Sequence, residues 1–323
     1  MKQDVLSVLE DNRGRSISGG QIARELGVTR AAVHKSVEAL RQEGWKIEAV
    51  VGRGYCLHTA CDIVSETGIR KGLKANSERD IQLFDNVGST NDVVKEYAVQ
   101  GAEEGLLVVA RSQTCGKGRR GRSFFSPDDN GIYMSLLLRP QTDAEVSLFL
   151  TVCAAVAVCR AVDAVTGKVT QIKWVNDIYF EGKKLCGILT EAAVEVESGS
   201  LDYAVLGIGI NVAPPAGGYP PELQGRAVSV EEMAPEAGPV KNRLIAAVVN
   251  EFESLYRSFE KKNFMEEYKT RSCIIGKNIT VLSAECAENA EVLDIDGEAR
   301  LVVRMENGEV RKLNSGDVSI RPN

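Results

Sequence analysis

The sequence is poor in the side chains that metal centres and disulfide scaffolds need. Its only histidines are His34 and His58, and its eight cysteines stand singly along 323 residues without a C-x-x-C pair. Structural zinc sites use closely spaced cysteine and histidine, and disulfide scaffolds use dense cysteine in short chains. Neither class of protein is expected here.

A long hydrophobic run is also missing. The most apolar stretch, residues 146–158, is too short to cross a hydrocarbon core of about 30 Å, so we expect a buried core helix. The first residues show no signal-peptide pattern, which predicts a cytoplasmic protein without a membrane partner. With 44% hydrophobic and 26% charged residues, the composition is that of a globular protein of two or three domains.

Acidic residues outnumber basic residues overall, but the charges are distributed unevenly along the chain. The formal net charge is −6. Residues 1–60 hold nine Lys or Arg against seven Asp or Glu, a balance of +2, so residues 61–323 carry −8. An acidic surface repels nucleic acid. Any nucleic-acid binding is therefore expected in the first segment.

That segment has the order of a winged helix-turn-helix. Apolar spacing predicts a first helix around residues 5–9, a short second helix over 21–26 that ends at Gly27, and a third over 30–43. Residues 45–51 and 55–58 then alternate as a hairpin. The third helix would enter the major groove. The expected DNA contacts are Thr29, which also caps this helix, and Arg30, His34, Lys35 and Arg53. A three-helix packing module without nucleic acid is the alternative.

A loop of glycines and cations occupies residues 116–122, with the sequence Gly-Lys-Gly-Arg-Arg-Gly-Arg. Glycine lets the backbone approach a ligand, and four cations would neutralise a phosphate or carboxylate. The run matches G-x-G-x-x-G, but it joins two predicted strands rather than a strand and a helix. No P-loop motif occurs. An anion site outside both nucleotide-binding motifs is expected, and a solvated basic loop is the alternative.

Hydroxyl and amide groups gather in a second segment. Ser89, Thr90 and Asn91 lie at a predicted strand-to-helix junction. Helix capping alone explains them, but ligands often bind at such a junction, and these side chains would suit a polar uncharged ligand group.

Two further segments are predicted to lie in strands. Segments 173–179 and 183–191 are expected to pair as a hairpin that brings Asp177 near a lysine. Such a pair is usually a surface contact, but beside a triphosphate it could hold magnesium. The strand 204–211 contains Gly207 and Gly209, which indicates close approach to its backbone.

In order, these motifs resemble the family of bifunctional biotin–protein ligases and biotin operon repressors. The resemblance covers the whole chain, through the winged helix, 88–91, Gln113 with the glycine loop, 173–177, 184–188 and 207–211. It implies an α/β (α+β) fold with three domains. These are an N-terminal winged helix-turn-helix (1–62), a central mixed-sheet domain like class II aminoacyl-tRNA synthetases (63–271), and a small C-terminal β-barrel resembling SH3 (272–323). Short strand patterns with Asp-Gly and Asn-Gly turns after residue 276 agree with the barrel.

The resemblance also implies an ATP-dependent ligase. Biotin and Mg-ATP would give biotinyl-5′-AMP, and the biotin would pass to a lysine of the biotin carboxyl carrier protein of acetyl-CoA carboxylase. The adenylate would be the corepressor of a homodimer on operator DNA. Because neither step needs an enzyme nucleophile, catalysis is expected from positioning and charge neutralisation.

The same resemblance assigns the site residues. Lys184 and Arg119 are the expected catalytic residues, and Asp177 is expected to hold Mg²⁺. Biotin contacts are expected from Ser89, Thr90, Asn91, Gln113, Lys117, Gly118, Arg119, Lys184, Gly207 and Gly209. Nucleotide contacts are expected from Arg119, Arg120, Arg122, Asn176 and Asn211.

Three positions depart from the family pattern. Lys117 stands where arginine is usual, Phe124 where tryptophan is usual, and Val175 where proline is usual. Lysine keeps the charge but loses the planar fork, so biotin affinity is expected to change while the reaction survives. Phenylalanine still covers an apolar ligand without an indole N–H.

Two other functions stay open at this point. One is a biotin-sensing transcription factor without ligase activity, which is disfavoured because Lys184, Asp177 and Arg119 are all present. The other is a lipoate-type adenylate-forming ligase, which is disfavoured by the winged helix and the complete glycine loop.

Overall fold

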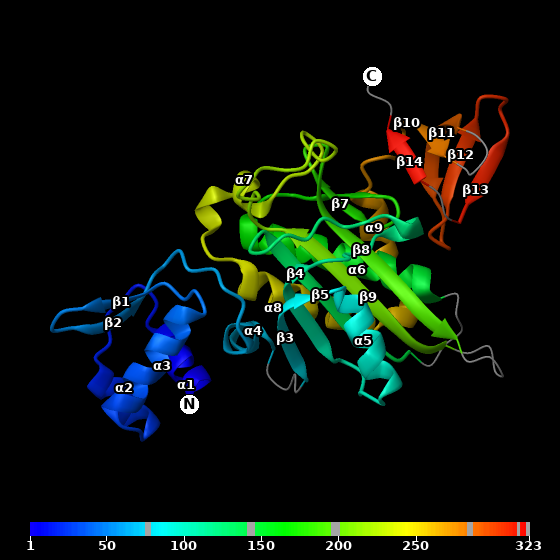
Figure 1. Ribbon diagram of the computed structural model, residues 1–323. Coiled ribbons are helices and arrows are strands. Elements are labelled where there is room, and N and C mark those ends of the chain that lie inside the picture. The colour runs from blue at the N-terminus through cyan, green and yellow to red at the C-terminus, as the bar shows by residue number, and fades with distance from the viewer. Residues whose placement is uncertain (75–78, 141–145, 195–200, 283–286, 315–316, 321–323) are drawn as a thin grey trace.

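The computed structural model describes residues 1–74, 79–140, 146–194, 201–282, 287–314 and 317–320. Its elements form three groups along the chain: a helical unit with a two-stranded wing, a seven-stranded sheet with helices on both faces, and a five-stranded sheet (Figure 1). This is the predicted order of a winged helix, a mixed α/β domain and a small β domain. The seven cysteines among these residues are free, and Cys286 lies outside the described residues.

The N-terminal unit has its own core. It consists of α1 (Lys2–Asp11), α2 (Gly19–Leu26), α3 (Arg30–Gln42), β1 (Ile47–Val50) and β2 (Gly54–Leu57). Ser18 and Thr29 cap α2 and α3, because their side-chain oxygens accept the N–H groups of Gln21 and Ala32. Gly27 ends α2 with a left-handed φ of 66°. The apolar faces of the three helices and the wing enclose a cluster separate from the rest of the core.

The central sheet has the strand order β3-β4-β5-β9-β8-β7-β6. β3 and β4 are parallel, and the other neighbouring pairs are antiparallel. The strands are β3 (Ile81–Val87), β4 (Leu107–Gln113), β5 (Gly131–Leu138), β6 (Gln171–Lys173), β7 (Asp177–Phe180), β8 (Lys183–Val194) and β9 (Leu201–Asn211). Every residue of β5 is buried, which places this strand at the centre of the core.

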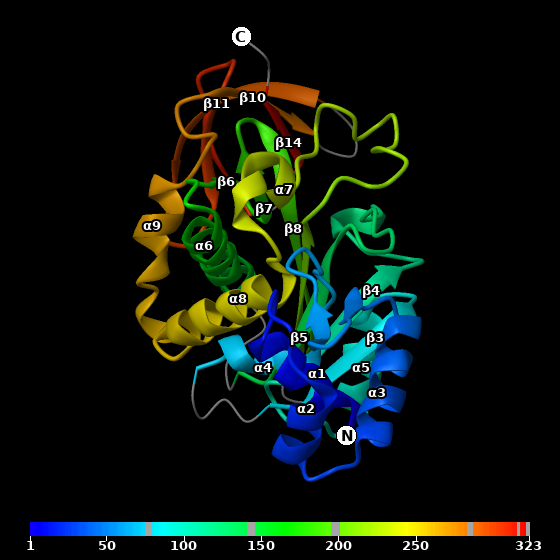
Figure 2. The ribbon, with the colours of Figure 1, turned by 90° about the vertical axis from the view of Figure 1, so that its left-hand side faces the viewer.

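Helices cover both faces of this sheet. On one face α5 (Thr90–Val99) packs through Val94 and Ala98. On the other face α6 (Val146–Thr166), α8 (Lys241–Tyr256) and α9 (Phe264–Thr270) lie together (Figure 2). The shorter helices are α4 (Glu66–Gly72), α7 (Val230–Met233) and the 3-10 turns Arg119–Gly121, Pro235–Ala237 and Phe259–Lys261.

Helix α6 is longer than the sequence predicted. It has 21 residues, and by length and composition its segment 147–166 is long and apolar enough to cross a membrane. The expectation that this stretch is too short is therefore wrong. Residues 150–159 of α6 are nevertheless all buried within the protein core, which is where the sequence predicted a core helix.

The C-terminal sheet is antiparallel, with the order β13-β12-β11-β10-β14. Its strands are β10 (Asn278–Leu282), β11 (Ala287–Ile295), β12 (Leu301–Met305), β13 (Val310–Leu313) and β14 (Asp317–Ile320). The turn between β11 and β12 reaches the central domain, where the Trp174 indole donates to the Ala299 carbonyl at 2.9 Å. Lys269 of α9 pairs with Asp294 at 3.0 Å. These contacts hold the small domain beside β6 and β7.

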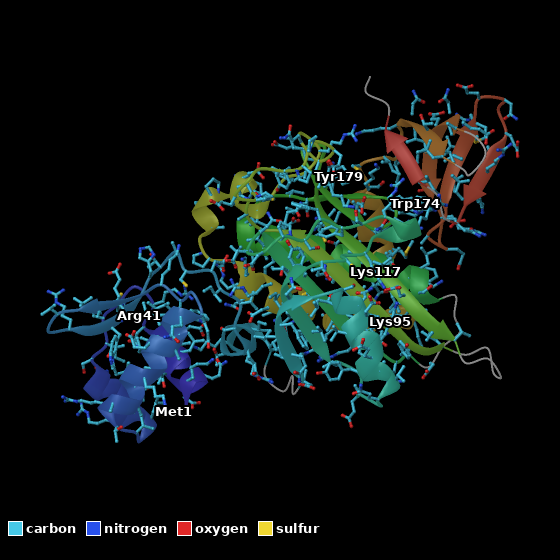
Figure 3. The ribbon with its side chains drawn as sticks, viewed as in Figure 1. Met1, Arg41, Lys95, Lys117, Trp174 and Tyr179 are labelled. Atoms are coloured by element: carbon cyan, nitrogen blue, oxygen red, sulfur yellow. The ribbon has the colours of Figure 1, made fainter. Side chains whose placement is uncertain are left out.

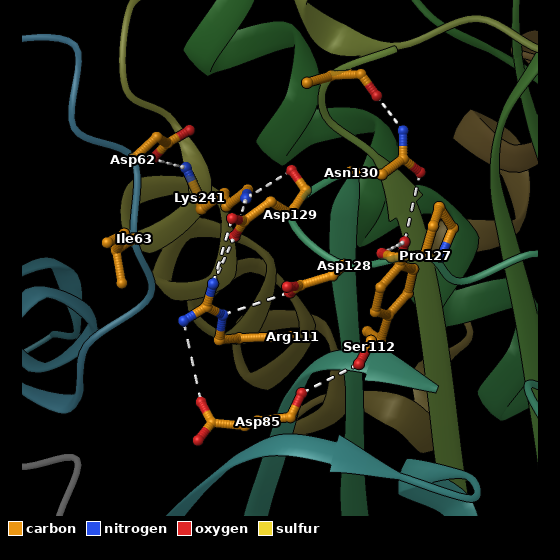
Figure 4. Close-up of polar contacts among 12 residues, drawn as sticks. Asp62, Ile63, Asp85, Arg111, Ser112, Pro127, Asp128, Asp129, Asn130 and Lys241 are labelled. Carbon is orange, nitrogen blue, oxygen red and sulfur yellow. Dashed lines mark hydrogen bonds and ion pairs between the residues drawn. The ribbon is translucent and has the colours of Figure 1, made fainter. Parts of the chain in front are cut away.

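Polar contacts join the N-terminal unit to the central domain. The Asp62 carboxylate accepts the N–H groups of Val240 and Lys241 at the start of α8, both at 3.0 Å. The Lys241 ammonium donates to the Asp129 carbonyl at 2.9 Å, and the Asp129 carboxylate lies 3.2 Å from the Arg111 guanidinium on β4. Figure 4 shows this series of contacts, which connects the linker after the wing to the loop before β5.

Asp296 stabilises the turn between β11 and β12 through its charge. Burial opposes ionisation, but hydrogen bonds from Arg300, from backbone N–H groups and from Lys312 outweigh it and lower the pKa of Asp296 from 3.8 to about 2. A carboxyl group whose pKa is lower in the folded protein adds stability above its unfolded pKa and loses it as the pH falls through the folded value.

We therefore expect Asp296→Asn to lower the free energy of unfolding at pH 7, by about 2 kcal/mol at most. The difference from wild type should narrow as the pH falls below about 4. Urea denaturation of both proteins across this pH range measures it. A difference that does not change with pH would show that the carboxylate charge is not its source.

Candidate active site

Strand register brings motifs that are distant in the sequence onto one row. Tyr133 of β5 lies opposite Gly209 of β9, which lies opposite Gly187 of β8. Gly187 lies opposite Asp177 of β7, and Asp177 lies opposite Lys173 of β6. Directly opposed residues of antiparallel strands point to the same face. The row therefore crosses five strands, with two glycines at its centre and charged residues at one end.

A second row lies one step along the same face and consists of Ser135, Gly207 and Leu189. A Cβ atom on Gly207 would collide with the side chain of Asn91, and one on Gly209 would collide with the ring of Phe124. The close approach that these glycines predict is therefore present. In this structure, side chains of the protein make that approach.

A small pocket, called the ligand pocket below, opens above the two rows. It is lined by seven of the predicted biotin contacts: Ser89, Thr90, Asn91, Gln113, Lys117, Gly207 and Gly209. Phe124, Met134, Gly187, Leu189 and Ile208 complete the lining. The ligand pocket thus combines apolar walls with hydroxyl and amide groups and one cation, which suits a small ring with a few polar atoms.

Hydrogen bonds fix the polar side of the ligand pocket. The Thr90 N–H donates to Gln113 Oε1 at 2.8 Å, and Gln113 Nε2 donates to Ser126 Oγ at 3.0 Å. Ser89 is the N-cap residue of α5, yet its buried hydroxyl makes no capping hydrogen bond. Helix capping therefore does not explain this serine, and its hydroxyl is available for a ligand.

A second cavity, called the charged groove below, continues from the ligand pocket and shares Lys117, Phe124, Gly187 and Leu189 with it. The rest of its lining is Gly118, Arg119, Arg122, Ser123, Lys173, Trp174, Asn176, Asp177, Lys184 and Ile188. Five Lys or Arg residues thus face one carboxylate, and such an excess of positive charge attracts anions.

The charged groove contains the predicted pair of lysine and aspartate. Lys184 Nζ lies 2.7 Å from Asp177 Oδ1 and 5.9 Å from the centre of the Phe124 ring. Arg119 donates to Asn176 Oδ1 at 3.4 Å. Three predicted biotin contacts, namely Lys184, Arg119 and Gly118, line the charged groove rather than the ligand pocket.

The glycine loop is tied to helix α5. Lys117 Nζ donates to Asp92 Oδ1 at 2.5 Å, and this hydrogen bond raises the pKa of Lys117. A Cβ atom on Gly116 would collide with the Phe124 carbonyl, so glycine is needed where the loop returns. Lys117 and Lys95 lie near α5, whereas Trp174 and Tyr179 lie toward the C-terminal domain (Figure 3).

Two predicted nucleotide contacts lie outside the charged groove. Arg120 lines a separate hollow with Thr151 and Thr190, because the loop turns at this residue, whose φ is 57°. Asn211 is buried and donates to the Val228 carbonyl at 3.2 Å. Its amide therefore holds the segment that follows β9.

The predicted DNA contacts lie on the N-terminal unit. Arg30, His34 and Lys35 are exposed on α3, and Arg53 is exposed at the tip of the wing. His34 Nδ1 lies 3.1 Å from the Tyr55 hydroxyl of the wing, so this side chain also braces the hairpin. Thr29 acts as the helix cap.

Two residues beside the ligand pocket, Ser135 and Glu191, were missed by the sequence reasoning. Ser135 lies within hydrogen-bond distance of Thr90 and Asn91, and Glu191 accepts from Asn91 and Lys95. A polar residue in a strand that is otherwise apolar was the available signal for Ser135. Glu191 gave no local signal, because its partners Asn91 and Lys95 lie on α5, about a hundred residues earlier in the sequence.

The described residues contain no group of three or more His, Cys, Asp or Glu side chains placed to hold a metal ion. In the charged groove, Asp177 is the one carboxylate of the lining. Any metal there would need most of its ligands from a substrate or from water.

Comparison with known proteins agrees with this arrangement. The model of the biotin/lipoate A/B protein ligase family matches residues 83–211, that of an HTH domain matches 2–56, and that of the biotin protein ligase C terminal domain matches 274–321. The chain is 35% identical to the bifunctional ligase/repressor BirA of Bacillus spizizenii, over 99% of this chain and 98% of that protein. It is 24% identical to the Escherichia coli BirA, over 95% and 94%.

Solved structures show the same likeness. The biotin protein ligase from Aquifex aeolicus in complex with biotin and ATP is 26% identical, and the match covers 76% of this chain and 99% of that chain with a TM-score of 0.63. Together with the full-length match to the Bacillus protein, this shows that the chain belongs to the biotin/lipoate A/B protein ligase family, with the domain order of its bifunctional ligase/repressor members.

Proposed function

We propose that this protein is an ATP-dependent biotin ligase and also a biotin-responsive transcriptional repressor. As a ligase it makes biotinyl-5′-AMP from biotin and ATP and passes the biotin to a lysine of a biotin carboxyl carrier protein. As a repressor it binds operator DNA through its N-terminal unit. Relatives that match over the full length and carry both activities in their names support both halves.

The continuity of the ligand pocket with the charged groove carries the ligase half. An acyl adenylate needs a largely neutral site for its acyl ring and positive surroundings for its phosphate. The two cavities meet at Lys117 and Phe124. The biotin ring would lie beside Ser89 and Thr90, its carboxylate would point toward this boundary, and the nucleotide would lie in the charged groove.

The residues divide between these two tasks. We assign biotin contacts to the side chains of the ligand pocket and to Gly118 of the loop. Gly207 and Gly209 form the floor, and Lys117 lies where the carboxylate would emerge. Lys184, Arg119 and Arg122 would face the phosphates, and Asn176 would position Arg119, from which it accepts a hydrogen bond.

The reaction needs no nucleophile from the protein. A carboxylate oxygen of biotin attacks the α-phosphorus of ATP, and the bond to the bridging oxygen breaks to release pyrophosphate. An acceptor lysine amine then attacks the acyl carbon, and the acyl C–O bond breaks to release AMP. Both steps gather negative charge on oxygen, which the cations of the charged groove stabilise.

Magnesium would enter with ATP. Mg²⁺ is commonly held by one or two carboxylates together with substrate phosphates, and the charged groove offers Asp177 for this role. Asp177 is ion-paired with Lys184 in this structure. When phosphates are present, Lys184 would neutralise their oxygens while Asp177 binds the ion.

We further propose that the protein works in the cytoplasm as a homodimer, with the adenylate as corepressor. ATP, the carrier protein and operator DNA all meet there. Domain boundaries at residues 62 and 271 are consistent with this division of labour, since the matched HTH and C-terminal segments lie within 1–62 and 272–323.

Transfer of radiolabelled biotin to a carrier protein in the presence of Mg-ATP tests the ligase half, and a gel shift with operator DNA tests the repressor half. Biotin-dependent DNA binding without transfer would indicate a sensor. Transfer of lipoate in place of biotin would indicate the lipoate-type ligase.

Lys184→Ala should lower the rate of adenylate formation about a hundredfold, because a cation aimed at developing phosphate charge acts mainly in the transition state. Biotin binding should change little. Pyrophosphate release at saturating biotin measures the rate. Lys183→Ala is the matched control, since Lys183 is the exposed neighbour on β8. A rate within about threefold of wild type would remove Lys184 from this role.

Arg119→Gly should release biotinyl-5′-AMP into solution, because one of the charges that hold its phosphate is lost. The free adenylate is reactive, so lysines of bystander proteins should become biotinylated. A mixture of carrier protein and an unrelated lysine-rich protein, blotted for biotin, measures this. A reaction without ATP gives the background. Selectivity equal to wild type would contradict the assignment.

Removal of residues 1–62 should abolish operator binding and leave ligation intact, because these residues carry the basic balance and the exposed cations of α3 and the wing. The combined substitutions Lys35→Ala and Arg53→Ala test the same surface in the full chain. They should weaken DNA binding and flatten its salt dependence. Operator binding by residues 63–323 would place the DNA site elsewhere.

A further inference from the structure

The turn between β6 and β7 supplies much of the lining of the charged groove. β6 ends at Lys173 and β7 begins at Asp177, and both residues line the groove together with Trp174 and Asn176. Val175, the remaining residue of this segment, is buried. Residues 173–177 are called the groove turn below. Its three central residues lie outside the paired strands β6 and β7, so their positions depend on other contacts.

The groove turn contacts two of the cations that we assign to the phosphates. Asn176 Oδ1 accepts a hydrogen bond from Arg119 at 3.4 Å, and Asp177 Oδ1 lies 2.7 Å from Lys184 Nζ. Asn176 is also bonded to β8, because its Nδ2 donates to the Ile188 carbonyl at 2.7 Å and its own carbonyl accepts the Ile188 N–H at 3.0 Å. The placement of both cations therefore depends on where the backbone of the groove turn lies.

Tyr268 of α9 holds the middle of the groove turn. Its hydroxyl donates to the Val175 carbonyl at 2.9 Å, and both residues are buried. A buried carbonyl that loses its donor bears the full cost of desolvation, because water does not take the place of the lost partner. The hydroxyl therefore fixes the backbone directly before Asn176 and Asp177.

Packing alone does not account for the hydroxyl of Tyr268. The residue is fully buried within the core, where the ring by itself would fill the space, and a buried hydroxyl is costly unless it is hydrogen-bonded. Burial raises the pKa of Tyr268 well above its usual value, although the charge of Arg119 opposes this rise. The hydroxyl thus stays protonated and remains a donor at neutral pH.

Other contacts hold the beginning of the groove turn. The Ile172 N–H donates to the Arg271 carbonyl at 2.8 Å, and the Cys273 N–H donates to the Ile172 carbonyl at 2.9 Å, so the segment after α9 pairs with β6. The Trp174 indole donates to the Ala299 carbonyl, and Trp174 lies toward the C-terminal sheet (Figure 3). The tyrosine hydroxyl adds the contact at the middle of the turn.

We propose that Tyr268 is a positioning residue for the nucleotide. It touches no substrate, but its hydroxyl fixes the groove turn, and the turn in this position keeps Arg119 and Lys184 directed at the phosphates. This inference rests on the proposed function, which places ATP in the charged groove. The ligand pocket contains no residue of the groove turn in its lining, so the effect of Tyr268 should be confined to ATP.

Tyr268→Phe tests this role, because it removes the hydroxyl and keeps the ring. At saturating biotin, kcat/KM for ATP in pyrophosphate release should fall about tenfold, as expected when a buried carbonyl loses its partner. The Kd for biotin, measured without ATP, should change by less than about twofold. Tyr256→Phe is the matched control, since the Tyr256 hydroxyl donates to Glu104 at 2.9 Å and Tyr256 lines neither cavity. It should leave both values unchanged.

A double-mutant cycle with Asn176→Ala separates positioning from a general loss of stability. If Tyr268 acts through the groove turn, its hydroxyl matters less once Asn176 no longer contacts Arg119. The combined loss in kcat/KM for ATP should therefore be clearly smaller than the product of the two single losses. Losses that multiply would show that the two residues act independently and would overturn the proposal.

Trp174→Phe decides the question if Tyr268→Phe does not fold. It removes the indole N–H that holds the beginning of the same turn and keeps an aromatic ring in the groove. The value of kcat/KM for ATP should fall about three- to tenfold, again with biotin binding unchanged. An unchanged kcat/KM for ATP would show that the position of the turn does not matter, and the proposal would be wrong.

The outcomes separate this inference from the proposed function. A wild-type protein that releases no pyrophosphate from ATP in the presence of biotin overturns the proposed function itself. If wild type is active, equal losses for biotin and ATP in Tyr268→Phe would indicate damaged packing and overturn the positioning role. A folded Tyr268→Phe variant with the kinetics of wild type would overturn it as well.

Discussion

The register between β8 and β9 is the constraint on which the rest of the site depends. It sets Gly187 opposite Gly209 and Leu189 opposite Gly207. Three glycines, which have no side chain, therefore lie next to one another on one face of the sheet. Because side chains alternate along a strand, a slip of one residue would turn these glycines toward the α6 face and take the side chains of Ile188 and Ile208 out of the core. Those isoleucines are buried in the core, and their burial opposes the slip.

The site separates recognition from charge. In the ligand pocket, Thr90 and Gln113 are held by neutral groups, the Asn91 amide donates to the Glu191 carboxylate, and the cation Lys117 is held by Asp92 at the boundary. The charged groove concentrates the remaining cations. Neutral hydrogen bonds in a closed pocket discriminate strongly between similar rings, whereas cations stabilise phosphate charge without much discrimination. The two departures from the family pattern at residues 117 and 124 both lie at this boundary, since Lys117 and Phe124 line both cavities.

The sequence predicted the elements and the chemical character of the site better than its geometry. Local signals were sufficient for Thr29 as a cap, for the hairpin that pairs Lys184 with Asp177, and for a close approach at Gly209. Local signals were not sufficient where the position or role of a residue depends on backbone conformation or on contacts between distant segments. The position of Arg120 depends on the left-handed backbone conformation of this residue, which an arginine in the sequence does not predict. The role of Glu191 depends on α5 bringing Asn91 and Lys95 to β8, which no local pattern encodes.

Strand β4 and the returning end of the glycine loop connect the ligand pocket to the DNA-binding unit. The two segments are joined twice: Gln113 bonds to Ser126 at the pocket, and Arg111 contacts Asp129 two residues back along β4. Since residues two apart on a strand share a face, both contacts lie on the same side of β4. Asp129 then contacts Lys241, whose N–H is held by the carboxylate of the linker. The pocket and the winged helix are thus connected to the same two segments. A change in the packing of the loop at Gln113 would therefore reach the linker through only a few contacts.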